Sequence, residues 1–383
     1  MNFAFCLESI TQFGRRKFQP AQIGLYFILT MPTPTLPHKI APKITRQITP
    51  HIPLAAYRRL IPRNPIGFFY HTVSDVPLPH VRHLYPYKSA AEFEQDILYL
   101  KQHFTLIGYP MLEELSKIQK QSTRLPTLPS KAAFLSFDDG FSECYTVVRS
   151  ILLKHNIPCI FFLTTDWIDN QAMYYRGKMS LVIETLALLN VEKQTAALRR
   201  INAAFKLELV DLSTFSAWIL RHQRSEEPLV DWVCDLLELD VKDYLNTNHP
   251  FLTRTQIAQM QSEGFVFGAH TRRHPKLSTV SQEEQTAEIV ESCRIVSEIT
   301  GKDQVPFAFP FSGSGVDRDF LAELRTQNPF IGPIFDTQKL RLDRPFIFHR
   351  IWADKPVPGI PPEENIAYWL HDAYVREVNR TQS

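Results

Sequence analysis

The sequence predicts an α/β fold built on a parallel sheet. From residue 66 onward, short apolar segments alternate with amphipathic helices, which is the pattern of strand–helix–strand units in parallel sheets. Polar clusters follow several of the predicted strands directly, at the sheet edge where α/β proteins carry out their chemistry. A run of helical periodicity interrupts the alternation between residues 168 and 250.

The predicted elements before the interruption are short. Their apolar residues either run continuously, as in a strand buried on both faces, or recur at helical spacing, as do Phe93, Ile97 and Leu100. Asp138 and Asp139 stand immediately after the second of three strands, and Gly140 lets the backbone turn there. In chain order the elements are strand 66–70, helix 90–103, strand 132–137, helix 142–155 and strand 158–163.

The interruption predicts a helical insertion, with helices over 179–189, 193–209 and 228–239. If it covers the carboxyl end of the sheet, the substrate is small or threaded. If it lies away from that end, the cleft is open to polymer. The elements after it are helix 253–263, strand 265–268, helix 281–300, strand 305–309, strand 346–348 and an amphipathic helix over 363–378.

The composition excludes several classes of protein. The 383 residues are 44% hydrophobic with a net charge of +2, so the chain can bury a core and is not disordered. Near-neutral charge argues against a partner nucleic acid bound through a basic field. The five cysteines are scattered with no CxxC pair, which predicts small buried residues rather than a thiolate zinc site or a disulfide framework.

Residues 1–65 are predicted to be a Pro-rich N-terminal extension or arm, because they hold 9 of the 28 prolines and show no sustained periodicity. The apolar run 23–31 is too short to cross a membrane, and no other segment is a transmembrane candidate. No clean cleavage site follows it, so we expect a cytoplasmic protein. Secretion or a periplasmic location through a weak signal, and a start at Met31, are the alternatives.

Two aspartates and two histidines are the most informative polar residues. His270 and His274 have i, i+4 spacing, but the strand before them and Pro275 after them favour a tight loop over a helix. Alone, such a pair is more often structural, and adjacent aspartates before a glycine are common in turns. Together, one carboxylate and two imidazoles leave open positions on a divalent ion, as catalytic metal sites do. A second aspartate can stay off the metal and accept a proton from water.

The segments around these residues resemble motifs of the polysaccharide deacetylase family, the NodB-homology domain of chitooligosaccharide-deacetylase type. Residues 134–141 (FLSFDDGF) resemble its first motif, residues 268–275 (GAHTRRHP) its second and, more loosely, residues 307–313 (FAFPFSG) its third. The similarity covers roughly residues 66–354, interrupted by the insertion. It implies a deformed (β/α) barrel whose members use a divalent metal to remove acetyl groups from N-acetylated sugars.

The resemblance also implies a role for each matching residue. Asp139, His270 and His274 would bind the metal, with zinc first and cobalt or nickel as alternatives. Asp138 would be the base that takes a proton from the attacking water. A backbone N–H of the third motif, that of Phe311, would stabilise the oxyanion.

The sequence departs from the family's fullest pattern at three places. The third motif often carries an arginine that orients the base, and the matching stretch has none, which leaves Arg350 as a candidate substitute. His349 is the predicted catalytic acid of the fifth motif, with a structural histidine as an equal alternative. Asp336 and Asp343 match the fourth motif poorly. His71 is expected to line the site without a catalytic role.

The predicted organisation is an extension over 1–65, a deacetylase domain over 66–354 with insertion 168–250, and a helical tail over 355–383. The predicted function is a metal-dependent hydrolase of carbon–nitrogen bonds, other than peptide bonds, that acts on an N-acetylated carbohydrate. An amidase or esterase for another acyl group is one alternative. A barrel that binds metal or glycan without turnover is the other. No pattern in the sequence indicates an oligomeric state.

Overall fold

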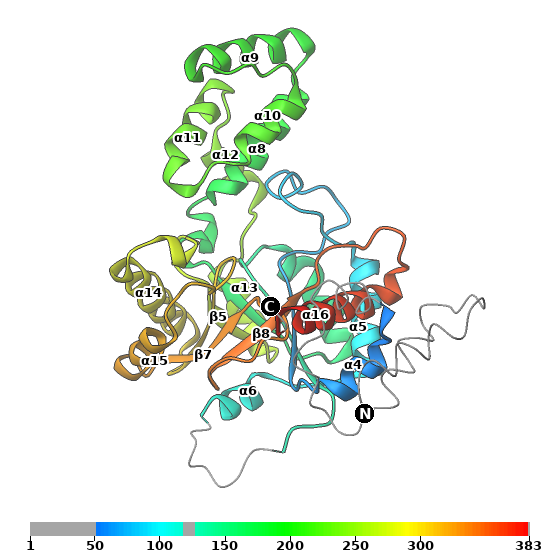
Figure 1. The fold of residues 1–383 in the computed structure, drawn as a ribbon. Coiled ribbons are helices and arrows are strands. Elements are labelled where there is room, and N and C mark those ends of the chain that lie inside the picture. The colour runs from blue at the N-terminus through cyan, green and yellow to red at the C-terminus, as the bar shows by residue number, and fades with distance from the viewer. Residues whose placement is uncertain (1–50, 118–126, 382–383) are drawn as a thin grey trace, which may run out of the picture. The chain divides into compact units, whose positions relative to one another are not determined.

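Seven parallel strands close into a barrel in the computed structural model, which describes residues 51–117 and 127–381. The ring runs β1, β3, β4, β5, β6, β7, β8 and back to β1, while β2 pairs only with the start of β3. Figure 1 labels β5, β7 and β8 of this ring, with helices around them. The predicted (β/α) barrel is therefore confirmed. The strands are β1 Ile66–Tyr70, β2 Thr105–Leu106, β3 Ala132–Phe137, β4 Ile160–Leu163, β5 Val266–Ala269, β6 Val305–Ala308, β7 Ile331–Asp336 and β8 Ile347–Trp352.

Helices surround the barrel and begin and end at recognisable caps. Ser89 forms a capping box with Glu92 at the start of α5. The side chain of Ser281 caps α14, and Gly301 ends it in the left-handed conformation with a φ of 64°. The helices of this layer are α5 Ala90–His103, α6 Tyr109–Ser116, η2 Cys144–Val148, α7 Arg149–His155, η3 Thr165–Asn170, α13 Arg254–Ser262, η5 Leu277–Thr279, α14 Gln282–Thr300, α15 Arg318–Gln327 and η6 Pro362–Glu364.

Aromatic side chains fill the barrel interior. The ring centroids of Phe162 and Phe335 lie 5.1 Å apart, and that of Phe134 lies 5.6 Å from Phe335. Gly268 of β5 makes room for this packing, since a Cβ there would lie 2.6 Å from both the Phe162 ring and the carbonyl oxygen of Pro306. Gly268 thus lets the backbone of β5 approach its neighbours closely. The interior is a packed core that supports the carboxyl ends of the strands from below.

The insertion is a group of five helices with a core of its own. Phe215, Trp218 and Val230 are buried there, and the same apolar cluster continues to Trp167, which follows β4. The insertion therefore packs continuously onto the carboxyl end of the barrel. Its helices are α8 Tyr175–Leu188, α9 Val191–Phe205, α10 Leu212–Ile219, α11 Glu227–Leu236 and α12 Val241–Asn248, with η4 Arg224–Glu226 before α11.

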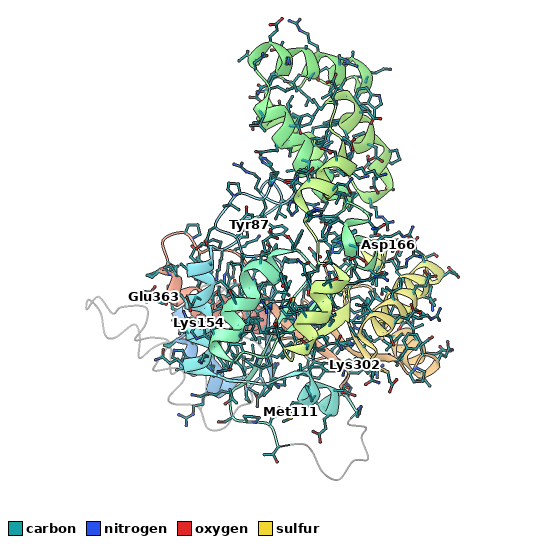
Figure 2. The ribbon with its side chains drawn as sticks, turned by 180° about the vertical axis from the view of Figure 1, so that it is seen from behind. Tyr87, Met111, Lys154, Asp166, Lys302 and Glu363 are labelled. Carbon is teal, nitrogen blue, oxygen red and sulfur yellow. The ribbon has the colours of Figure 1, made fainter. Side chains whose placement is uncertain are left out.

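The two ends of the barrel carry different elements. Seen from behind, Asp166, just after β4, lies where the insertion joins the barrel, whereas Met111 of α6 lies at the opposite end (Figure 2). Asp138 and His270, each the residue after a strand, belong to the end that faces the insertion. The predicted polar clusters thus share one end of the barrel.

The described residues outside 64–369 form a second compact unit. It contains α4 Leu54–Leu60 and the end of α16 Asn365–Thr381, where the Tyr57 ring stacks on Tyr374 at 5.6 Å. The expected extended arm therefore includes a short helix before residue 66. The predicted signal or leader segment, Met31 and Cys6 lie outside the described residues. The other four cysteines are buried and unpaired, as expected.

None of the helices within the described ranges combines the length and the apolar character that a membrane span requires.

Candidate active site

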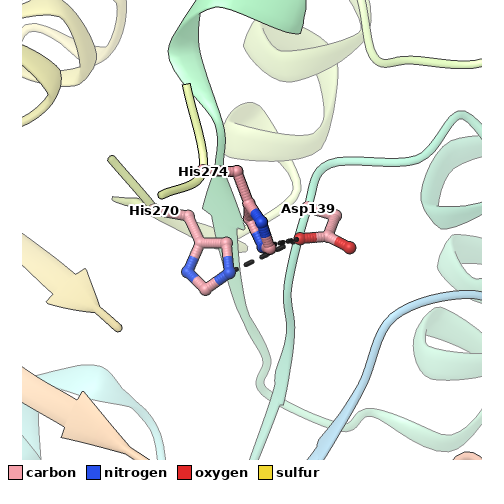
Figure 3. A group of neighbouring side chains, drawn as sticks. All are labelled: Asp139, His270 and His274. Atoms are coloured by element: carbon pink, nitrogen blue, oxygen red, sulfur yellow. Dashed lines mark ion pairs between the residues drawn. The ribbon is translucent and has the colours of Figure 1, made fainter. Parts of the chain in front are cut away.

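Asp139, His270 and His274 meet at the carboxyl ends of β3 and β5 (Figure 3). Asp139 Oδ1 lies 3.4 Å from His270 Nε2 and 3.2 Å from His274 Nε2. One ligand atom from each residue lies within 4.8 Å of the others, and all three side chains are buried. The three residues predicted as metal ligands are therefore brought together at distances at which they could share one ion.

The donor atoms fit a divalent metal ion. His270 Nδ1 lies 2.9 Å from the carbonyl oxygen of Ala308, which leaves Nε2 as the ligand atom. Burial lowers the pKa of His270 to about 4, so its imidazole is neutral, as metal binding requires. Asp139 Oδ1 is buried without a hydrogen-bond partner among the described residues. A cation at this point would remove the cost of that unpaired oxygen.

The backbone at the site is held in an unusual conformation. Asp139, His274 and Phe311 have φ angles of 73°, 59° and 57°, in the left-handed region that residues other than glycine rarely adopt. Each such residue costs about 1–3 kcal/mol, which the surrounding fold must offset. Gly140, at 78°, makes the tight turn expected of it. Left-handed residues from three loops thus converge where the predicted ligands meet.

Arg350 holds Asp138 with two hydrogen bonds. Its Nη1 donates to Oδ1 at 2.6 Å and its Nη2 donates to Oδ2 at 2.9 Å, while Nη1 also donates to Ser136 Oγ at 2.9 Å. Arg350 is fully buried and lies over the ring of Phe69. This forked contact fixes the orientation of the carboxylate. An arginine of β8 therefore takes the place of the arginine that the third motif lacks.

Phe311 lies beside His274, with ring centroids 4.9 Å apart. The carbonyl oxygen of Phe311 accepts a hydrogen bond from Thr337 Oγ1 at 2.7 Å, which helps to fix the loop. Its N–H donates no hydrogen bond to any of the described residues. The predicted oxyanion donor therefore lies near a candidate metal ligand, and its N–H has no hydrogen-bond partner among the described residues.

His71 follows β1 and forms a close pair with Asp354. Its Nδ1 lies 2.5 Å from Asp354 Oδ2, and its backbone N–H donates to Oδ1 at 2.9 Å. Burial opposes protonation of the ring, but Asp354 outweighs burial and raises the pKa of His71 to about 9, with smaller contributions from Asp139 and Asp138. His71 is therefore an imidazolium at neutral pH, within electrostatic reach of both aspartates, with 16% of its side chain exposed.

The comparison with protein families agrees with this geometry. Residues 126–206 and 231–327 match the family model described as polysaccharide deacetylase. The chain contains a polysaccharide deacetylase domain. It is therefore an enzyme, a hydrolase that removes acetyl groups from carbohydrate.

Several solved structures resemble the deacetylase in fold. PplD, a deacetylase from Streptococcus pyogenes solved with acetate, is 15% identical with a TM-score of 0.47, over 80% of this chain and 97% of its own. IcaB from Ammonifex degensii is 15% identical with a TM-score of 0.45, over 81% and 97%. A de-N-acetylase from Aggregatibacter actinomycetemcomitans is 17% identical with a TM-score of 0.47, over 79% and 98%. Among curated proteins, none matches the chain.

His349 does not lie with the metal-ligand residues. The strand expected to end at Phe348 continues to Trp352, so Phe348 and His349 project to opposite faces of β8. Phe348 packs in the aromatic cluster of the barrel interior. His349 Nε2 lies 3.2 Å from Asp343 Oδ2 on the other face. His349 as catalytic acid stays a prediction, with no contact to the ligand residues among those described.

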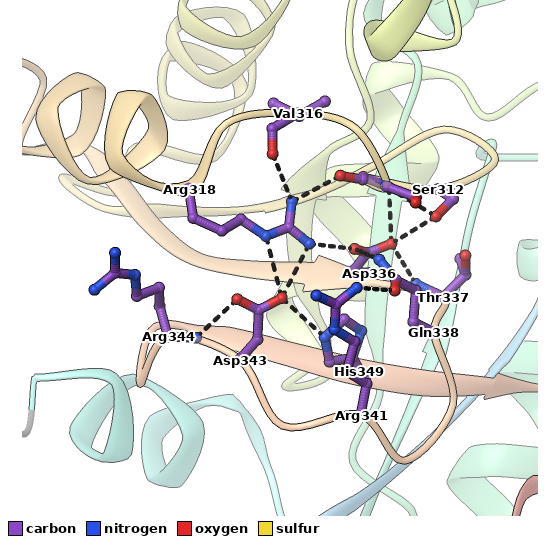
Figure 4. A network of polar contacts seen from close by, with 12 residues as sticks. Ser312, Val316, Arg318, Asp336, Thr337, Gln338, Arg341, Asp343, Arg344 and His349 are labelled. Atoms are coloured by element: carbon purple, nitrogen blue, oxygen red, sulfur yellow. Dashed lines mark hydrogen bonds and ion pairs between the residues drawn. The ribbon is translucent and has the colours of Figure 1, made fainter. Parts of the chain in front are cut away.

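The acids near His349 support the third-motif loop instead (Figure 4). Asp336 Oδ1 accepts a hydrogen bond from the N–H of Gly313 at 2.8 Å, and its Oδ2 accepts one from Arg318 at 3.0 Å. Arg318 also donates to the carbonyl oxygen of Gly313 at 2.7 Å and to Asp343 at 3.0 Å. These contacts tie β7 and the segment before β8 to the loop that carries Phe311.

Glu288 of α14 holds the loop between the two histidines, and the sequence analysis missed it. Its carboxylate accepts hydrogen bonds from the backbone N–H groups of Arg272 and Arg273, at 2.8 and 3.0 Å, and from Arg273 Nε at 2.7 Å. Only 1% of Glu288 is exposed. An acid on the apolar face of a predicted helix was the one signal in the sequence that could have identified it.

Proposed function

We propose that the deacetylase hydrolyses the acetamide of an N-acetylated sugar within an oligo- or polysaccharide, at a divalent metal ion held by Asp139, His270 and His274. The convergence of these three ligand atoms within 4.8 Å carries the proposal. Two imidazoles and one carboxylate suit zinc best, and cobalt or nickel accept the same donors. A bound divalent cation would polarise the acetamide carbonyl and lower the pKa of a water molecule.

Asp138 is the proposed base. As the water oxygen bonds to the carbonyl carbon, Asp138 accepts a proton from that water. Arg350 keeps both oxygens of Asp138 in place, through contacts of 2.6 and 2.9 Å. The N–H of Phe311 donates a hydrogen bond to the carbonyl oxygen as negative charge develops on it. Because Asp138 and Arg350 hold each other through buried contacts, the base needs little reorganisation during the reaction.

His71 is the proposed acid. Its raised pKa of about 9 keeps a proton on the ring at neutral pH, which it gives to the amide nitrogen as the carbon–nitrogen bond breaks. Acetate and the free amine of the sugar are the products. Asp354 orients the ring by accepting hydrogen bonds from the backbone N–H of His71 and from Trp352 Nε1 at 2.9 and 2.7 Å.

Metal removal and restoration test the proposal. Acetate release from N-acetylated chitotetraose should cease when a chelator strips the protein and return when zinc is added. His270→Ala/His274→Ala should lose both metal occupancy and activity, because one carboxylate alone binds a transition metal weakly. His249→Asn is the matched control, since this exposed histidine of the insertion forms no contact with the three ligand residues among those described, and asparagine tolerates its left-handed φ of 45°.

Three results would contradict parts of the proposal. Full activity of the metal-free protein would show that the reaction does not need a metal ion. Full metal occupancy in the double variant would show that His270 and His274 are not the metal ligands. Release of acetate from an acetyl ester but from no acetamide would replace the amidase reaction by an esterase reaction.

A further inference from the structure

A groove of about 950 Å³ extends from His274 to the helical insertion. The barrel side contributes Pro275, Lys276 and Phe311, and the insertion side contributes residues of α8, η4 and α11. Part of the insertion side falls in residues 207–230, between the two segments that match the family model. The family model therefore does not match the part of this wall that carries Arg224. Its lining residues from the insertion are Tyr175, Arg176, Gln223, Arg224, Ser225, Glu227, Pro228 and Asp231.

Each acid that lines the groove lies close to a cation. Lys178 Nζ lies 2.7 Å from Glu227 Oε1 and 2.6 Å from Asp231 Oδ1. On the barrel side, Arg273 lies 3.3 Å from Glu284. Because Lys178 offsets only one of its two acids, one negative charge remains there, beside the three cations that line the groove, Arg176, Arg224 and Lys276.

The cations that line the groove have no such partners. Arg176, Arg224 and Lys276 form no ion pair with any residue in the part of the chain that the structure describes. Arg176 and Arg224 are half-buried and both act on the Tyr175 hydroxyl: burial raises the pKa of Tyr175, and the two guanidinium charges oppose that rise. Two guanidinium groups therefore act on one point of the groove wall, together with Glu227, which already pairs with Lys178.

We propose that Arg176 and Arg224 bind an anionic group of the glycan, a carboxylate or a phosphate, carried next to the N-acetylated sugar. The inference rests on the proposed function and narrows its substrate to an anionic N-acetylated glycan. Guanidinium forks match the planar geometry of carboxylate and phosphate oxygens. Phe311, which is 42% exposed and lies beside His274, offers an apolar face to a sugar ring between the two sites.

Three tetrasaccharide probes test this inference on the zinc-loaded full chain. N-acetylated chitotetraose is neutral, its 1-phosphate carries a phosphate, and a hyaluronan tetrasaccharide carries carboxylates. Titration calorimetry at low salt should show at least one anionic probe binding about tenfold more tightly than chitotetraose, as expected for a charge-assisted contact of about 1.4 kcal/mol or more. Which anionic probe gains affinity distinguishes phosphate from carboxylate recognition.

Arg176→Gln/Arg224→Gln should abolish that preference and leave the affinity for chitotetraose unchanged. Arg199→Gln/Arg200→Gln is the matched control, because it removes two exposed arginines from α9 of the same insertion and should keep the preference. If thermal unfolding shows that the first double variant does not fold, Arg224→Gln alone replaces it and should weaken the preference.

The outcomes separate this inference from the proposed function. Equal binding of all three probes by the wild-type protein, or a preference that survives loss of the groove arginines, overturns the inference. A preference lost equally in the control variant also overturns it, because the effect is then one of general charge. A specific preference without acetate release supports the groove and contradicts the proposed deacetylation. Equal acetate release from all probes with equal affinity supports deacetylation alone.

Discussion

The barrel and the helical insertion supply different kinds of residue to the candidate site and to the groove beside it. The barrel contributes Asp138, Asp139, His270 and His274, all of them buried, and of these His274 also lines the groove. Asp138 and His270 are held by hydrogen bonds to Arg350 and to the carbonyl oxygen of Ala308. The insertion contributes Arg176 and Arg224, which are half-buried and form no ion pair with the described residues. The strand ends hold the reacting groups in fixed positions, as catalysis requires. Residues of the insertion can change the substrate specificity without moving those groups.

The two regions are nevertheless joined by packing. The apolar cluster of the insertion continues to Trp167, whose ring centroid lies 5.4 Å from that of His274. Tyr174, at the start of α8, lies 5.1 Å from the same histidine. The insertion therefore packs against His274, one of the candidate metal ligands. This packing fixes the position of Arg176 and Arg224 relative to the candidate site.

The largest expected effect tests the barrel. Asp138→Asn should lower kcat for acetate release by about 10²–10⁴-fold, because an amide cannot accept the proton from water. Metal content should stay unchanged, since Asp138 is not a ligand in the proposal. The groove variant Arg224→Gln, measured with neutral chitotetraose, should keep kcat. Full activity of the Asp138→Asn protein would show that Asp138 is not the base.

The proposed acid, His71, is tested in two ways. His71→Asn should lower kcat/KM by about 10²-fold, and the pH dependence of kcat/KM reports the pKa of the acid. Because the folded pKa of His71 is raised to about 9, the protonated acid is present below that pH and is lost as the pH rises through it. Asp354→Asn removes the largest cause of the rise and leaves burial to lower the pKa. The alkaline limb should then move down by about two units or more.

The groups that face His71 are Asp354, Asp138, Asp139 and the Tyr85 ring, whose centroid lies 5.3 Å away. A bound cation would repel the imidazolium and lower the limb in wild type and Asp354→Asn alike, so the difference between them is the informative quantity. His71→Asn should show no alkaline limb in this range. An unmoved limb in Asp354→Asn would assign the proton donation to another group, of which His349 is the next candidate.

The smallest expected effect concerns the loop between the histidines. Glu288→Gln should weaken metal affinity by about tenfold. The amide nitrogen of glutamine cannot accept the hydrogen bonds from the loop that a carboxylate oxygen of Glu288 accepts. Glu284→Gln is the matched control on the same helix, since among the described residues the Glu284 carboxylate forms a hydrogen bond only with the Arg273 side chain, at 3.3 Å. Equal metal affinity of both variants, measured by competition with a chelating dye, would show that the loop holds its shape without Glu288.

Much of the barrel was predictable because its strands are continuous apolar runs. The predicted bounds 66–70, 90–103 and 132–137 coincide with β1, α5 and β3. Strand β7 was missed, because Gly332 and Pro333 interrupt its apolar pattern and both residues favour loops over strands. Helix α15 was missed as well. The local sequence pattern therefore predicted the strands whose residues are apolar because both faces are buried. It failed for β7, where the barrel imposes a strand on residues that favour a loop.

The site divides in the same way. Asp139, His270 and His274 stand in local patterns that the sequence displays, and the structure brings them together. The partner of His71 is Asp354, 283 residues away, and no local pattern connects the two. His349 was assigned from a strand whose end was predicted four residues too early, since β8 runs to Trp352. A one-residue difference in strand position changes the face on which a side chain lies.

The sequence alone indicated the fold class, the candidate metal-ligand residues and the candidate base, because each depends on short segments whose periodicity and polar residues are fixed along the chain. The tertiary structure decided which residues pair with them. It brought Arg350 of β8 to Asp138, Asp354 to His71, and Arg176 and Arg224 to the groove. These pairings depend on closure of the barrel and on packing of the insertion. Both arise from contacts between residues far apart in the sequence, which local patterns do not encode.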